Sequence, residues 1–161
     1  MRLADTAVST TLRVLNNVAV VAERSMWWPG TSATWHESHN APGATATGTR
    51  WALAEGQVGG TRGIDTYVLI ANTSAADGDV RVTLLFEDGS NISKVFTIGA
   101  RSRFNVDPRA EFPAALDRRF GMLVESLGST PAQLVVERAM YWDAAGQRWA
   151  AGTAALATRL P

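Results

Sequence analysis

The chain has no cysteine, only two histidines and no long apolar run among its 161 residues. The absence of cysteine excludes disulfides, thiolate metal sites and a cysteine nucleophile. Fifteen basic residues cancel fifteen acidic ones, so we expect no general attraction to nucleic acid. No apolar stretch approaches the roughly 20 residues of a membrane-spanning helix, so membrane insertion is not expected.

Sequence motifs of catalysis are also missing. The serine-nucleophile pattern Gly-x-Ser-x-Gly does not occur, and Gly56–Gly60 does not open a helix as a phosphate-binding loop must. We therefore predict a protein that is not an enzyme and that needs no cofactor.

A repeated segment is the most informative feature that is present. Val18–Trp28 returns 114 residues later as Ala132–Trp142. Five positions are identical in the two segments: Val21/Val135, Glu23/Glu137, Arg24/Arg138, Met26/Met140 and Trp28/Trp142. Self-similarity at a fixed spacing is typical of tandem modules.

The similarity extends on both sides of this segment. Trp35 aligns with Trp149, and Gly43–Arg50 aligns with Gly152–Arg159 at a spacing of 109, which predicts a five-residue insertion in the first copy. Residues 1–49 are thus interpreted as the C-terminal part of a preceding repeat unit, and residues 50–161 as a complete module. The fragment must then pack on the full unit, pair with a sheet edge or join a neighbouring chain.

The hydrophobic pattern is that of strands throughout. Residues 79–87 alternate with period two, Asp88-Gly89 provides a hairpin turn, and residues 92–98 resume the extended pattern. Residues 108–113, with two prolines, predict a loop with one helical turn. The other predicted strands are 10–15, 18–27, 44–50, 51–55, 66–71, 102–106, 120–126, 133–141 and 152–159. The fold class predicted is all-β, an antiparallel β-sandwich.

Two motifs carry a family resemblance. The opening Trp51-Ala-Leu-Ala-Glu-Gly56 and the strand order that follows resemble the sensory rhodopsin transducer family. Together with Val136-Glu-Arg-Ala-Met-Tyr141, the opening also resembles a group of exported bacterial tandem-repeat modules. The resemblance implies a β-sandwich that oligomerises and binds without catalysis, with sugars or small metabolites as ligands. It transfers no catalytic residues.

Aromatic side chains near polar ones form the candidate ligand site. Flat rings beside carboxylates and imidazoles suit sugars, which stack on rings and hydrogen-bond through hydroxyls. The candidate ligand-binding residues are Trp35, His36, His39, Trp51, Glu55 and Asp65. Packing of the tryptophans in the core or between units is the preferred interpretation, because buried aromatics dominate core energetics.

His36 and His39 also allow a metal hypothesis, with Glu37 or Glu55 as a third ligand. The spacing is not that of zinc hydrolases, so a polar loop is preferred and no metal site is predicted.

Two adjacent Glu-Arg pairs, Glu23-Arg24 and Glu137-Arg138, fall inside predicted strands. Successive strand residues face opposite sides, so an inward arginine needs a carboxylate partner such as Asp65 or Glu55. We predict structural ion pairs here.

The sequence thus favours a structural or adhesion module of an exported, repetitive bacterial surface or fibre-forming protein, located outside the cell or at its surface. Its expected partners are neighbouring repeat units or like chains. The alternative is a carbohydrate-binding module that uses the aromatic residues as a stacking platform.

Overall fold

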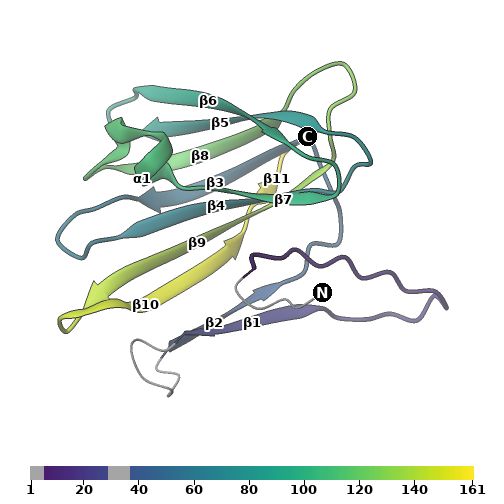
Figure 1. Cartoon of the computed structure of the whole chain (residues 1–161), viewed down its shortest axis with the longest axis horizontal. Coiled ribbons are helices and arrows are strands. Elements are labelled where there is room, and N and C mark those ends of the chain that lie inside the picture. The colour runs from purple at the N-terminus through teal and green to yellow at the C-terminus, as the bar shows by residue number, and fades with distance from the viewer. Residues whose placement is uncertain (1–5, 29–36) are drawn as a thin grey trace.

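The structure, a computed structural model, describes residues 6–28 and 37–161. Two antiparallel sheets face each other, and a separate two-stranded hairpin lies against one of them (Figure 1). The first sheet has the order β10-β9-β4-β7, and the second has the order β11-β3-β8-β5-β6. The predicted all-β antiparallel sandwich is confirmed.

The four-stranded sheet is built from segments far apart in the sequence. Its strands are β4 (Asp65–Asn72), β7 (Ser102–Val106), β9 (Leu134–Ala144) and β10 (Gln147–Leu156). β9 pairs with β4 over eight residues, from Asp65 opposite Tyr141 to Asn72 opposite Leu134. This register places Val68, Ile70 and Val136 on the inner face.

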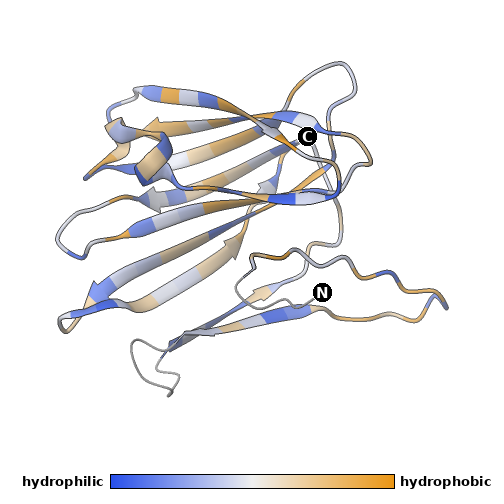
Figure 2. Ribbon diagram, in the orientation of Figure 1, coloured by the Kyte–Doolittle hydropathy of each residue, from blue (hydrophilic) through white to orange (hydrophobic). Residues whose placement is uncertain are grey.

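The five-stranded sheet supplies the other wall of the core. Its strands are β3 (Arg50–Gln57), β5 (Gly78–Phe86), β6 (Asn91–Ile98), β8 (Arg119–Ser126) and β11 (Thr158–Arg159). The inward residues Val80, Val82, Leu84, Met122 and Val124 are at most 1% exposed. Alternation with exposed polar residues along β5 and β6 is visible as alternating colours in Figure 2. The period-two pattern therefore selected the buried face correctly.

The connection between β7 and β8 closes one end of the sandwich. It contains α1 (Pro108–Glu111) and a short 3₁₀ turn, η1 (Pro113–Ala115). The Asp107 side chain caps α1 by accepting a hydrogen bond from the Arg109 backbone N–H at 2.9 Å. The loop predicted for residues 108–113, with one helical turn, is confirmed.

The N-terminal residues form one hairpin rather than the three strands predicted. β1 (Glu23–Trp28) pairs with β2 (Glu37–Pro42), while residues 6–22 contain no strand. The predictions of a strand at 10–15 and of strands at 18–22 and 44–49 are therefore wrong. These segments have strand-like composition, but a strand exists only where its backbone groups are paired, and in 44–49 the only strand-type pairing is an isolated bridge between Gly48 and Leu134. β2 was missed because Glu37–Pro42 is polar.

The hairpin register gives the two copies one constant spacing. Glu23 lies opposite Pro42, and Glu137 lies opposite Leu156. Both strands are thus offset by 114 residues (137 − 23 and 156 − 42). This constant offset of 114 disagrees with the sequence alignment of Gly43 with Gly152, whose spacing is 109. That alignment followed a run of small residues, whose similarity carries little positional information.

Candidate functional site

An aromatic interface joins the hairpin to the outer face of the four-stranded sheet. The Trp28 ring meets Tyr141 edge-on at a centroid separation of 5.2 Å, and its Nε1 donates to the Trp149 carbonyl at 2.8 Å. Tyr141 in turn stacks on Trp149 at 5.1 Å. Tyr67 completes the cluster at 6.3 Å from Trp149. Edge-to-face and offset pairs of this kind add to the free energy gained from apolar burial.

Gly152 permits this close approach. A Cβ built on Gly152 would lie 2.7 Å from Tyr141 Cδ1, 2.9 Å from the Met140 carbonyl oxygen and 3.0 Å from Trp28 Cζ2. A side chain at this position of β10 would therefore displace the Trp28 ring. The absence of one is part of the fit between hairpin and sheet.

His39 lies at the centre of the interface. It is 8% exposed, and its ring centroid is 5.3 Å from that of Trp28. Neither ring nitrogen has a hydrogen-bond partner. Burial first, and then the positive charge of Arg24, lower the pKa of His39 below its usual 6.5. The neutral imidazole consequently serves here as a packing group.

The same interface contains an ion pair between the two copies. Arg24 Nη2 lies 3.1 Å from Glu137 Oε2. Arg103, next to this pair, has its pKa lowered by burial and by the charge of Arg24. Arg24 and Glu137 thus form an ion pair between the two repeated segments, whereas the sequence analysis considered Asp65 and Glu55 as partners of an inward arginine. Glu23 is exposed and takes no part in the interface.

Arg138 forms the second predicted ion pair. Its side chain is 6% exposed, and its Nη1 donates to Glu55 Oε2 at 2.7 Å. Glu55 is itself 71% exposed, so the pair joins a buried cation to a surface carboxylate. Glu55 is one of the two partners, with Asp65, that the sequence analysis considered for an inward arginine. Breaking such a pair leaves an uncompensated buried charge.

Asp65 is held by two partners that the sequence gave no reason to choose. Its Oδ1 accepts from Arg109 Nε at 2.8 Å and lies 2.7 Å from Arg109 Nη2. Its Oδ2 accepts from Trp149 Nε1 at 2.9 Å. Trp149 has a positive φ of 52° and donates its backbone N–H to Asp143 Oδ1 at 2.9 Å. Asp65 thus fixes the Trp149 ring against Tyr141.

The candidate ligand residues do not come together in one place. Trp51 is 3% exposed in the core, and its Nε1 donates to the Gly48 carbonyl at 3.2 Å. His39 and Asp65 are buried at the interface and beneath Trp149, whereas Glu55 is on the surface. Trp35 and His36 lie outside the described residues. Packing, the preferred interpretation for the tryptophans, matches the positions of Trp28, Trp51 and Trp149.

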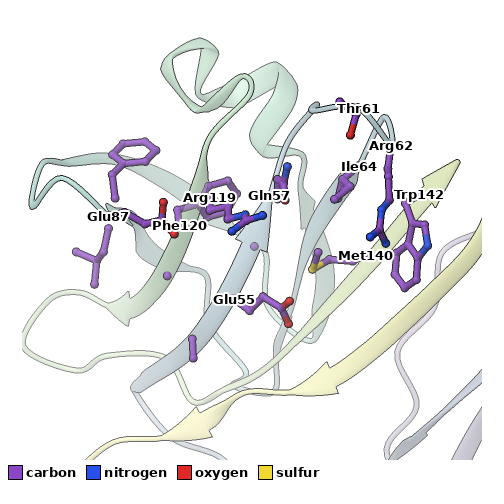
Figure 3. A pocket seen from close by; sticks show the side chains of 15 residues that line it. Glu55, Gln57, Thr61, Arg62, Ile64, Glu87, Arg119, Phe120, Met140 and Trp142 are labelled. Atoms are coloured by element: carbon purple, nitrogen blue, oxygen red, sulfur yellow. The ribbon is translucent and has the colours of Figure 1, made fainter.

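A shallow groove of about 620 Å³ lies at one end of the sandwich. Figure 3 shows the Arg62 side chain beside the Trp142 ring on one wall, with Glu55 pointing into the space between the walls. Gln57, Glu87 and Arg119 line the opposite part. Sequence reasoning named Glu55 as a candidate ligand residue but missed the rest of this groove, because its walls come from β3, β5, β8 and β9.

No metal cluster is found where the structure describes the chain. Among residues 6–28 and 37–161, no three histidine, aspartate or glutamate side chains are placed to hold an ion. The same residues contain no helix long and apolar enough to cross a membrane.

Comparison with known proteins finds similarity only among solved structures. No protein-family model matches the sequence, and no curated protein matches it. The crystal structure of Thermotoga maritima 1070 is similar with a TM-score of 0.58 at 14% identity, over 70% of this chain and 95% of that one. The Anabaena sensory rhodopsin transducer is similar with a TM-score of 0.48 at 24% identity, over 60% and 86% of the two chains. The Thermotoga match extends the evidence for the fold to an experimentally solved protein.

Proposed function

We propose that this chain is a non-catalytic structural or adhesion module of an exported, repetitive bacterial surface or fibre-forming protein. The observation that supports the proposal most is the docking of β1–β2 on β9–β10, its counterpart in sequence. The two hairpins share one register at a constant offset of 114 residues. Contact between successive copies of a supersecondary unit is how repeat proteins gain stability.

The docked face is specific as well as apolar. The Arg24–Glu137 ion pair and the hydrogen bond from the Trp28 indole fix one orientation of the hairpin. Directional polar contacts around an aromatic centre are typical of specific interfaces. An assembly of such units would be held by module-to-module contacts and by pairing of strand edges.

Solution mass tests the proposal. Sedimentation velocity over a wide range of protein concentration should show association that increases with concentration, and electron microscopy of the concentrated sample should show oligomers or fibres. A chain that stays monomeric at the highest concentration would contradict assembly through like chains.

A second candidate function is carbohydrate binding, which the groove at Trp142 favours. The Trp142 ring beside Arg62, with Glu55 and Gln57 elsewhere along the groove, combines a stacking surface with hydrogen-bonding groups (Figure 3). A glycan array should then give a hit that Trp142→Ala abolishes. Leu116→Ala is the control, because Leu116 is 52% exposed and is not one of the residues that line the groove. Absence of any glycan hit with the unaltered chain would remove this candidate.

A further inference from the structure

Trp142 differs from the tryptophans that hold the fold together. Trp28, Trp51 and Trp149 each donate the indole N–H to a carbonyl or carboxylate oxygen. Among the described residues, the Trp142 indole N–H has no acceptor and its ring has no aromatic neighbour. The ring is half-buried and lines the groove (Figure 3). Trp142 therefore offers the groove a stacking surface and a hydrogen-bond donor that the described chain does not use.

Arg62 is held beside this ring, on the same wall of the groove (Figure 3). The backbone N–H of Asp143, the residue after Trp142, donates to the Arg62 carbonyl at 2.8 Å. The turn that contains Arg62 is closed by reciprocal hydrogen bonds between Gly59 and Ile64, of 2.8 and 2.9 Å. The backbone at Arg62 is thus fixed before a ligand binds, which lowers the entropy cost of binding.

The guanidinium of Arg62 is not neutralised within the described part of the chain. None of the ion pairs between described residues includes Arg62. Asp143 is close in the fold, but alternation along β9 turns its side chain to the face opposite that of Trp142. There its Oδ1 accepts the backbone N–H of Trp149 at 2.9 Å. The positive charge beside the Trp142 ring is therefore available to a ligand.

The other charged residues of the groove leave this positive charge in excess. Glu55 points into the groove, but its carboxylate pairs with the buried Arg138 at 2.7 Å. Glu87 and Arg119, on the opposite part of the groove, carry one charge of each sign. These two glutamates and two arginines cancel, so Arg62 makes the groove positive overall.

We infer that the groove binds an acidic saccharide, with a hexuronate ring stacked on Trp142 and the carboxylate of that ring on Arg62. This inference rests on the second candidate function, carbohydrate binding, and names the class of saccharide. A guanidinium holds a carboxylate through two parallel N–H···O bonds, and an indole face packs on the C–H groups of a sugar ring. The Trp142 indole N–H and the Glu55 carboxylate are then the donor and acceptor for sugar hydroxyls.

The extent of the groove favours a chain of several sugar units. A second hollow, of about 380 Å³, shares Gln57, Glu87 and Arg119 with the groove. The two hollows therefore adjoin, and Arg119 lies where they meet. A ligand bound at Trp142 can extend along this path, and Arg119 is placed to meet the carboxylate of a further unit.

Isothermal titration calorimetry with hexagalacturonate and with its methyl ester tests the inference. The ester keeps the rings and hydroxyls but removes every negative charge. The unaltered chain should therefore bind the acid at least about tenfold more tightly than the ester. Hexa-aspartate, which has the charges without the rings, should bind more weakly than hexagalacturonate.

Arg62→Gln should remove the preference for the acid. The affinity for hexagalacturonate should fall about tenfold, while the affinity for the ester should stay the same. Arg62 is exposed in a turn, so the variant should fold normally, which circular dichroism checks. Arg101→Gln is the matched control, because Arg101 is exposed, has no ion pair in the described chain and does not line the groove.

The outcomes separate the inference from carbohydrate binding as such. Glycan hits confined to neutral saccharides, equal affinities for acid and ester, or an acid preference that survives Arg62→Gln would overturn the inference and leave carbohydrate binding in place. Hexa-aspartate that binds as tightly as hexagalacturonate would overturn the assignment to a saccharide. An unaltered chain that binds no glycan at all overturns both.

Discussion

Single residues determine how closely the hairpin approaches the sandwich. Trp28 reaches the Trp149 carbonyl only because Gly152 presents no side chain beneath the ring. Arg138 is buried only because Glu55 reaches it from the next sheet. Trp28 thus depends on Gly152 for its position, and Arg138 depends on Glu55.

Gly152→Ala should therefore destabilise the protein by about 1–3 kcal/mol, the usual cost of forcing an extra carbon into a packed site. The new Cβ would lie within 3.0 Å of Tyr141, Trp28 and the Met140 carbonyl. Gly121→Ala, a strand glycine whose nearest neighbour would be 3.5 Å away, is the control. Urea unfolding monitored by tryptophan fluorescence measures both. Equal midpoints for the two variants would contradict the close fit at Gly152.

The contacts of single residues also show which site predictions could be made from the sequence. Glu55 was a named candidate partner for an inward arginine, and it does hold Arg138. Arg109 was not foreseen as the partner of Asp65, because 44 residues separate the two and only the fold joins them. Trp51 belonged to the candidate ligand set, yet its ring is in the core. Residue type alone does not distinguish a ring that packs from one that binds.

At the scale of elements, alternation identified the strands that belong to the sandwich. The hairpin of β5 and β6 lies where period two and Asp88-Gly89 place it. The same procedure predicted N-terminal strands that do not form, because composition favours an extended backbone but does not provide a neighbouring strand to pair with. β2 is a strand because β1 pairs with it and because His39 and Ala41 are buried, two tertiary effects that no local pattern records.

The β1–β2 hairpin should loosen from the sheet as the pH falls. His39 is buried and neutral, and its pKa in the folded protein lies below its usual 6.5. Docking is therefore fully favourable above pH 6.5. It weakens as the pH falls from 6.5 toward the lower folded pKa, because only the undocked imidazole then takes up a proton. The loss is at most about 1.4 kcal/mol per pH unit.

Hydrogen exchange of β1 and β2 amides at pH 7.5 and 5.5, corrected for intrinsic rates, measures this loosening. His39→Phe removes the titration while keeping an aromatic ring, and should abolish the pH dependence. Arg24 faces His39 and pairs with Glu137. A pH dependence that persists in His39→Phe would assign the effect to another group.

At the scale of the whole molecule, two kinds of contact hold the chain together. The sandwich has a continuous buried core to which both sheets contribute, whereas the hairpin contacts the outside of one sheet through an aromatic cluster and the Arg24–Glu137 ion pair. Order of strands and sheet pairing came from tertiary contacts that a sequence pattern cannot give. The repeated segment, by contrast, was visible in the sequence and proved to mark the two hairpins that meet.

The shared register has one further consequence. Arg24, Met26 and Trp28 align with Arg138, Met140 and Trp142, the side of β9 that covers the interior of its own sandwich. The corresponding side of β1 packs instead on the outer face of the four-stranded sheet, at β9 and β10. This side of β1 cannot cover the interior of one sandwich and the exterior of another at the same time. β1 and β2 could therefore line a sandwich or pack on the outside of one, but not both at once, and in this structure they pack on the outside of the four-stranded sheet.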